Sequence, residues 1–377
     1  MKYFSKILFL LSILLFLGCG KDTTPKPAPL ADFKPTLNVE KSWSHSIGSN
    51  IGPDNLKLDP AFYGNQVFVP DYKGKITALD KTTGKSLWKT NTKTTITSSL
   101  AANGSLVFAG AGSGQLLALD KNNGESKWAA NLANEDLATP LATNNIVATK
   151  TTDGQLTVFN AATGSLLWKY MQEQPPLVLR GGSAPKAQDG LLISGFANGE
   201  IVAFNEDTGK ISWRQLVAEP SGTFAVERMV DIVADPVIVD NTIYVATYQG
   251  KIAALNLHNG RILWTKDAST FSGLAVTNNM VIISDANDYV TAFDRATGAQ
   301  LWQQKSLEYR GLTAPATISH YAVVGDAEGY LHFIDTRNGR FAARVAVGGG
   351  GIVAAPIVND NAVYVVTRSG YLAKFVL

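Results

Sequence analysis

The sequence predicts an all-β fold, an eight-bladed β-propeller with four antiparallel strands in each blade. Two observations lead to this prediction. A glycine, a second glycine ten residues later and a tryptophan four residues after that recur along the chain. The copies begin 38 to 51 residues apart. A self-similar period near forty, with several short strands in each unit, is typical of a propeller.

Three positions define each copy, and we name them the opening, turn and closing slots. The opening slots are Gly74, Gly114, Gly154, Gly199, Gly250, Asp288, Gly329 and Gly370. The turn slots are Gly84, Gly124, Gly164, Gly209, Gly260, Gly298 and Gly339. The closing slots are Trp88, Trp128, Trp168, Trp213, Trp264 and Trp302, followed by Ala343 in the seventh copy. We expect the tryptophans to pack between blades, each burying roughly 150–250 Å².

Each copy accommodates four strands. In the second copy, the apolar run Leu106–Ala109 precedes the opening slot and Gln115–Leu119 follows it. Asp120–Gly124 then predicts a hairpin, because glycine supplies the left-handed conformation that such a loop requires. The strand ending in Trp128 is the outermost. A proline 14 residues before six of the eight opening slots marks the innermost strand, since proline belongs at a sheet edge or a strand start.

The two ends of the chain complete the count of blades. The last copy, Gly370–Leu377, stops before a turn and a tryptophan strand. Lys41–His45 is a tryptophan strand, containing Trp43, with no repeat strands before it. We therefore expect the N-terminal strand to complete the C-terminal blade and to close the ring, which gives eight blades and a structural role for all seven tryptophans.

Residues 1–18 are predicted to be a cleaved signal peptide. Lys2 and Lys6 precede the apolar run Ile7–Leu17, which is too short to span a bilayer as a helix. Phe16–Cys19 resembles a bacterial lipoprotein box with cleavage before the cysteine. Cys19 is the one cysteine in the chain, so lipidation is favoured over an ordinary free thiol.

Three segments follow from this arrangement: the signal peptide, a lipidated flexible tether over residues 19–38, and the propeller over residues 39–377. The tether carries Pro25, Pro27, Pro29 and Pro35 and few large apolar residues, a composition that predicts no fixed structure. Gly20 follows the cysteine where aspartate resembles an inner-membrane retention signal, which favours sorting to the outer membrane.

Charge and residue content exclude several classes of function. Removal of residues 1–18 leaves 31 basic and 31 acidic residues, and this balance gives no global field for nucleic acid. A lone cysteine excludes a disulfide framework within the chain. The histidines fall at unrelated points of different repeats, without metal-ligand spacing: His45, His258, His320 and His332. We therefore expect neither catalytic residues, nor a metal site, nor a cofactor.

Two long connections between blades are the candidate binding site. Trp168 to Pro185 takes 17 residues and Trp213 to Pro236 takes 23, whereas ordinary connections take 10 to 13. We call the two connections insertion 1 and insertion 2. They join neighbouring blades and leave the same face of the ring, so they are expected to stand side by side. Long loops on a rigid scaffold are where binding concentrates.

The content of the insertions supports a partner-binding role. Insertion 1 places Leu177 and Leu179 beside Arg180, and arginine with apolar anchors is a typical interface composition. Insertion 2 contributes a mixed charged and apolar segment, whose candidate contact residues are Glu227, Arg228 and Asp231. The alternative is that the leucines fold back onto the blade and that Arg180 pairs with Asp231 inside the protein.

The repeat resembles the pyrrolo-quinoline-quinone family of propeller repeats, whose outer-strand tryptophans dock between blades. One implied function is that of a quinoprotein alcohol or glucose dehydrogenase. Those enzymes are longer, and many carry adjacent cysteines and calcium-binding acids that this chain lacks. Incubation with the quinone and calcium discriminates this alternative, because an enzyme would bind the chromophore and reduce a dye.

The whole chain is similar to the propeller lipoproteins of the outer-membrane β-barrel assembly (BAM) machinery. The resemblance includes Ser284–Asp288, Val324–His332 and the Leu-x-Leu-Arg-Gly sequence that starts at Leu177. In insertion 2, Val233 stands where the family has a second acid, so of the acids only Asp231 is carried over.

This second resemblance implies a non-enzymatic scaffold, lipid-anchored at the periplasmic face of the outer membrane. It also implies that the insertions bind the periplasmic part of BamA, the central barrel subunit, and through it the rest of the complex. Blade edges would hold unfolded outer-membrane protein clients by β-augmentation. Crosslinkers along the blade rims test that last idea, which fails if they never capture client precursors.

Overall fold

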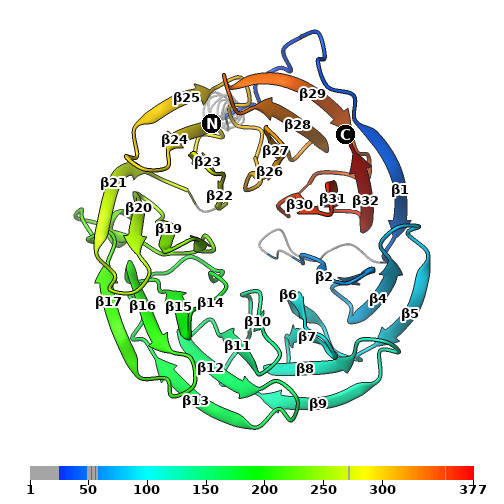
Figure 1. Cartoon of the computed structure of the whole chain (residues 1–377), viewed down its shortest axis with the longest axis vertical. Coiled ribbons are helices and arrows are strands. Elements are labelled where there is room, and N and C mark those ends of the chain that lie inside the picture. The colour runs from blue at the N-terminus through cyan, green and yellow to red at the C-terminus, as the bar shows by residue number, and fades with distance from the viewer. Residues whose placement is uncertain (1–24, 49–51, 53–55, 57, 271, 353) are drawn as a thin grey trace, which may run out of the picture.

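The protein forms a closed ring of small sheets. The computed structural model describes residues 25–48, 52, 56, 58–270, 272–352 and 354–377. Within these residues, eight four-stranded antiparallel sheets surround a common axis, as Figure 1 shows. The predicted eight-bladed propeller is therefore confirmed. No helix in the described part of the chain is both long and apolar enough to cross a bilayer. The predicted signal peptide and Cys19 lie outside the described residues.

Each blade contributes one strand to each of four concentric layers. The innermost strands are β2 (Ala61–Tyr63), β6 (Ile96–Ala102), β10 (Leu141–Ala142), β14 (Lys186–Gln188), β18 (Val237–Val239), β22 (Leu274–Val276), β26 (Ala316–Ile318) and β30 (Ile357–Asn359). The second strands are β3 (Gln66–Pro70), β7 (Leu106–Ala111), β11 (Ile146–Lys150), β15 (Leu191–Gly195), β19 (Thr242–Ala246), β23 (Met280–Ser284), β27 (Tyr321–Gly325) and β31 (Ala362–Val366). The third strands are β4 (Lys75–Asp80), β8 (Gln115–Asp120), β12 (Gln155–Asn160), β16 (Glu200–Asn205), β20 (Gly250–Asn256), β24 (Val290–Asp294), β28 (Tyr330–Asp335) and β32 (Tyr371–Val376). The outer strands are β5 (Ser86–Asn91), β9 (Ser126–Asn131), β13 (Leu166–Met171), β17 (Ile211–Leu216), β21 (Ile262–Ala268), β25 (Gln300–Gln304), β29 (Arg340–Ala346) and β1 (Glu40–Ser46).

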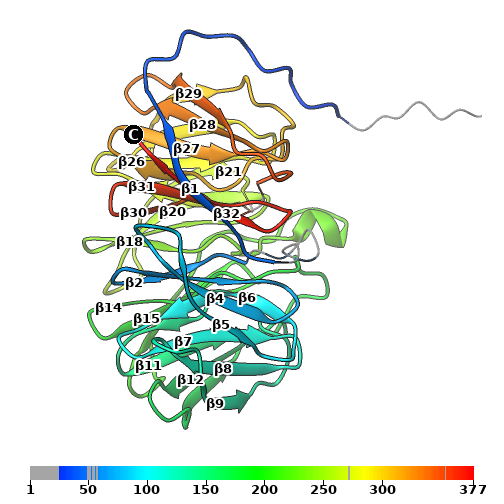
Figure 2. The same cartoon turned by 90° about the vertical axis from the view of Figure 1, so that its right-hand side faces the viewer.

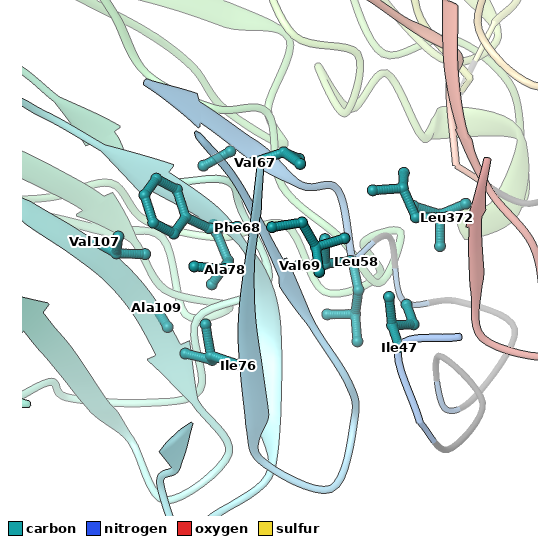
Figure 3. Close-up of a cluster of buried hydrophobic side chains, with 14 of the residues drawn as sticks. Ile47, Leu58, Val67, Phe68, Val69, Ile76, Ala78, Val107, Ala109 and Leu372 are labelled. Atoms are coloured by element: carbon teal, nitrogen blue, oxygen red, sulfur yellow. The ribbon is translucent and has the colours of Figure 1, made fainter. Parts of the chain in front are cut away.

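We number the blades from β2–β5 as blade 1 to β30–β32 with β1 as blade 8. The second and third strands are apolar along most of their length because neighbouring blades cover both of their faces. Figure 3 shows one such cluster, in which Phe68 and Val69 of β3 lie near Val107 of β7 and Leu372 of β32. The core is therefore a ring of clusters between blades.

The N-terminal strand completes blade 8, as predicted. The strand β1 pairs with β32 in antiparallel register, from Glu40 opposite Val376 to Ser46 opposite Tyr371. Segments from the two ends of the chain thus share one sheet, and their backbone hydrogen bonds close the ring without a covalent link.

The tryptophans join each blade to the next through a repeated contact. Every indole Nε1 donates a hydrogen bond to a backbone carbonyl of the following blade, as in Trp88 to Lys121 O at 2.8 Å. The same indole lies across the following turn slot, so that a Cβ on Gly124 would be 2.5 Å from Trp88 Cε3. Glycine is therefore required at the turn slots for two reasons: the backbone has a positive φ, and the indole leaves no room for a side chain. The sequence predicts the first of these, and the structure adds the second.

The structure also explains why alanine occupies the seventh closing slot. The third and outer strands of blade 8 come from opposite ends of the chain, so no hairpin joins β32 to β1. Blade 8 therefore has no turn-slot glycine on which a tryptophan of blade 7 could pack. Leu37 and Val39, just before β1, pack instead against the apolar cluster that contains Ala343. The entering N-terminal segment thus fills the junction that a tryptophan fills elsewhere.

Part of the predicted tether differs from its expected lack of fixed structure. Residues 28–37 run along blade 7, as Figure 2 shows for the blue segment above β29. The amides of Thr36 and Leu37 donate to Ala342 O at 2.9 and 3.2 Å. Phe33 stacks on Phe341 with ring centroids 5.4 Å apart, and Arg310 Nη1 donates to Ala28 O at 2.8 Å. Composition missed this because the docking site is formed by residues some 300 positions away.

We predict that Ala343→Trp destabilises the protein, although it restores the consensus of the repeat. The new indole would compete with Leu37 and Val39, and overpacking costs about 1–3 kcal/mol. Thermal melting measures the change. Ala346→Trp, at the exposed end of the same strand, is the matched control and should melt like the wild type. An unchanged or higher melting temperature for Ala343→Trp would show that the junction is empty.

Candidate functional site

The two insertions lie side by side, as their spacing predicts. Insertion 1 connects β13 to β14, and insertion 2 connects β17 to β18. The amide of Leu179 donates to Asp231 Oδ1 at 2.8 Å, and the amide of Ala184 donates to Asp235 Oδ1 at 2.7 Å. Two carboxylates of insertion 2 therefore hold two points of insertion 1.

The three predicted contact residues of insertion 1 differ in exposure. Leu177 is 43% exposed, and Leu179 is half-buried. Arg180 is exposed, and its guanidinium donates to Glu135 Oε2 in the preceding connection at 3.1 Å. The alternative pairing of Arg180 with Asp231 does not occur. Leu177 and Arg180 are thus exposed to solvent on a loop whose backbone amides are hydrogen-bonded to carboxylates of insertion 2.

Asp231 lies beneath insertion 1 and is not on its surface. The residue is 2% exposed. Burial raises the pKa of its carboxyl group, against the backbone hydrogen bond from Leu179 that lowers it. Its Oδ2 is buried and accepts no hydrogen bond from the described residues. The position of Asp231 fits a role in shaping insertion 1 better than the predicted role as a direct contact.

Insertion 2 presents a short 3-10 helix, η2 (Ala225–Arg228), which projects from the ring in Figure 2. Glu227 Oε2 accepts hydrogen bonds from the amides of Thr223 and Phe224 at 2.8 and 3.0 Å, and these bonds lower the pKa of Glu227. Glu227 therefore shapes the turn. Arg228 is exposed.

Two exposed apolar side chains on this turn were not predicted. Phe224 is 66% exposed and Val226 is 53% exposed. Their position inside the longest interior connection was the available signal in the sequence. Like Leu177, they are exposed apolar side chains of the insertions.

A second buried carboxylate, that of Asp136, belongs to the connection between β9 and β10, the same connection whose Glu135 pairs with insertion 1. Asp136 is fully buried. Its carboxylate accepts one hydrogen bond from the Thr149 hydroxyl and another, at 3.1 Å, from the backbone amide of Ala138. Burial raises the pKa of Asp136 to about 7. The adjacent Glu135 holds Arg180.

The insertions offer exposed apolar and charged side chains for surface contacts. Among the residues that the structure describes, no three His, Cys, Asp or Glu side chains are placed to share a metal ion. His332, one of the four histidines, is buried and accepts or donates a hydrogen bond at 2.9 Å with Asp326. Arg310, which also binds Ala28, pairs with the same carboxylate. This network lies on blade 7, far along the ring from the insertions in Figure 1.

Comparison with known proteins identifies the family. The model of a family described as outer membrane protein assembly factor BamB matches residues 72–304 and 286–375. The chain belongs to the BamB family. An outer membrane protein assembly factor BamB from Kangiella koreensis is 40% identical over 96% of this chain and 94% of that protein. The crystal structure of BamB from Moraxella catarrhalis covers 90% of this chain and all of that chain, with a TM-score of 0.84 and 28% identity.

The resemblance to quinoprotein enzymes is limited to the fold. Quinohemoprotein alcohol dehydrogenase from Comamonas testosteroni has a TM-score of 0.70 and 15% identity, and the match covers 90% of this chain and 76% of that enzyme. The resemblance to BamB extends over nearly the full length of both proteins. Val233 of insertion 2 is half-buried and faces Gly181 of insertion 1.

We predict a pH-dependent effect of Asp136→Asn. An unperturbed carboxyl titrates near ~3.9, so between about pH 4 and 7 the folded protein holds a proton here that the unfolded chain has lost. The wild-type free energy of unfolding therefore falls as pH rises through this range. Asparagine does not titrate. The free energy of unfolding of the Asp136→Asn variant should therefore rise relative to that of the wild type, by roughly 1–4 kcal/mol between pH 4 and 8.

Urea unfolding at pH 5 and pH 8 checks this prediction. Asp120→Asn is the control, because hydrogen bonds from the Asn122 amide and others lower the pKa of Asp120. The Asp120 carboxyl is ionised at both pH values. The difference in free energy of unfolding between Asp120→Asn and the wild type should therefore be the same at pH 5 and pH 8. If the difference for Asp136→Asn were also the same at both pH values, the Asp136 carboxyl would be ionised over the whole range from pH 5 to pH 8, and the prediction would be wrong.

Proposed function

We propose that this protein is a non-enzymatic scaffold of outer-membrane β-barrel assembly, tethered by a lipid on Cys19 to the periplasmic face of the outer membrane. Its insertions bind the periplasmic part of BamA and bring the propeller into the assembly complex. Membership of the BamB family supports the assembly role. The geometry of the insertions supports the contact surface.

One observation carries the proposed contact. Leu177 and Arg180 are exposed on a segment whose backbone is hydrogen-bonded to Asp231 and Asp235 of the next connection. A pre-ordered loop loses little conformational entropy on binding, which raises affinity. The exposed pair of Arg180 with Glu135 is worth about 0–1 kcal/mol, so Arg180 can turn to a partner carboxylate at low cost. Leu177 then supplies apolar burial.

We predict that the double variant Leu177→Ala, Arg180→Ala weakens binding to the purified periplasmic domain of BamA by at least about tenfold. This loss corresponds to roughly 1.4 kcal/mol or more. Calorimetric titration measures it. Thermal melting should stay near the wild-type value, because exposed side chains contribute about ±0.5 kcal/mol to stability.

The matched control is Arg261→Ala, Leu263→Ala on blade 5. Leu263 is 46% exposed and Arg261 is exposed, so the same side chains are removed from another part of the surface. The control should bind like wild type. Equal binding by both variants would move the contact away from insertion 1, whereas failure of the wild type to bind would remove BamA as the partner.

The anchor has its own test. Figure 2 shows that the described N-terminal end points to the side of the ring from which η2 projects. We predict that Cys19→Ser releases the folded protein from outer-membrane vesicles into the soluble periplasmic fraction. Fractionation with an antibody measures this, and mass spectrometry of the wild type should show an acylated N-terminus. A membrane-bound Cys19→Ser protein with an unmodified wild-type mass would contradict lipid anchoring.

A further inference from the structure

Lys150 departs from the repeat at a position where the other copies carry small or uncharged residues. It stands four residues before an opening slot, at the end of β11. The equivalent residues in the other copies are Pro70, Gly110, Gly195, Ala246, Ser284, Gly325 and Val366. A lysine in a slot otherwise reserved for such residues indicates a local role that the propeller itself does not require.

The ammonium group of Lys150 is buried under insertion 1. Lys150 is 7% exposed. Its Nζ donates to Ser183 Oγ at 3.0 Å and to Gly195 O at 2.5 Å, and lies 5.4 Å from the centre of the Phe196 ring. Ser183 belongs to insertion 1, and Gly195 ends β15 of the next blade. One side chain of blade 3 thus bonds both the insertion and blade 4.

The charge of Lys150 is balanced by carboxylates of the surrounding loops. Burial lowers its pKa to about 8, and attraction by Asp235, Asp136 and Asp231 opposes that shift. The amine therefore still carries its proton at neutral pH. Two of these acids are the groups that bind the Leu179 and Ala184 amides. Loss of the cation would remove the positive charge that attracts the buried carboxyl of Asp231, which is costly. Asp235 is partly exposed and also pairs with Lys186 at 3.3 Å.

The segment from Leu179 to Ala184 is therefore held at three points. Asp231 binds its first amide, Lys150 binds the Ser183 hydroxyl and Asp235 binds its last amide. Between these points lie Gly181 and Gly182, which have no side chains to restrain the backbone. A cavity of about 30 Å³ lies beneath, lined by Lys150, Leu179, Gly181, Asp231 and others. Phe196, Ile232 and Val233 also line this cavity, so the loop is held by the three polar contacts together with these apolar side chains.

We propose that Lys150 is a positioning residue for partner binding: from below, it fixes the Leu179–Ala184 segment in the conformation that presents Leu177 and Arg180. Lys150 does not touch the partner. This inference rests on the proposed function, and it adds a residue outside both insertions to the determinants of binding. Without Lys150, the segment must be ordered when the partner binds, and the conformational entropy lost in that step weakens the affinity.

The test compares two variants, Lys150→Met and Lys251→Met. Methionine keeps roughly the length of the lysine side chain and removes its charge. Lys251 is a partly exposed lysine on blade 5 that pairs with Asp267 at 2.5 Å. Hydrogen exchange of the amides in 177–186 reports the order of the loop, and calorimetric titration with the periplasmic domain of BamA reports affinity. For Lys150→Met we expect exchange in 177–186 about tenfold faster, the rest of the ring unchanged, and affinity about tenfold weaker. Lys251→Met should leave both values at wild type.

Each other outcome has a distinct meaning. Faster exchange spread over blades 3 and 4 with a lower melting temperature would make Lys150 a residue of general stability and overturn the proposal. Faster local exchange with unchanged affinity would overturn it as well, while BamA binding by the wild type would still stand. Failure of the wild type to bind would overturn the proposed function and this inference together.

A second variant covers the case in which Lys150→Met does not fold. Ser183→Ala keeps the cation and its carboxylates and removes only the hydroxyl that joins Lys150 to insertion 1. It should fold, exchange faster within 177–186 and bind several-fold more weakly. Wild-type exchange and affinity for Ser183→Ala would show that the bond to Lys150 does not order the loop.

Discussion

The closed ring depends on one contact that is repeated from blade to blade, an outer-strand indole lying across the turn glycine of the next blade. The indole N–H binds a carbonyl there and the ring covers a backbone that has no room for a Cβ. Aromatic area and a satisfied donor thus come from the same side chain. At the seventh junction, Leu37 and Val39 replace the indole because the two ends of the chain meet there.

A ring fixed in this way lets individual connections change without loss of the fold. Insertions 1 and 2 exploit this freedom, since both leave strands whose positions are set by the blades. Their conformation is set by charged groups: carboxylates below insertion 1 bind its amides, and Lys150 joins it to two blades. Buried charges are costly unless they are paired, so retaining them beneath a surface loop favours a role in shaping that loop.

In the proposed binding surface, the exposed residues and the residues that support them are separated by depth. Leu177, Arg180, Phe224 and Val226 are exposed, whereas Asp231 and Lys150 are buried. Substitutions in the two groups should differ in kind, because an exposed side chain acts through its own contact and a buried one acts through the loop above it. The N-terminal segment adds a further restraint, because its contacts with blade 7 fix where the chain leaves the ring.

The sequence by itself determined the number of blades, the ring closure, the structural role of the tryptophans and the location of both insertions, since each of these follows from a period or from a departure from it. It did not determine that Asp231 is buried, that Arg180 pairs with Glu135, or that residues 28–37 dock on blade 7. These contacts join residues separated by 52, 45 and up to some 300 positions. Their geometry exists only once the blades have closed into a ring, because closure places loops of different repeats within hydrogen-bonding distance.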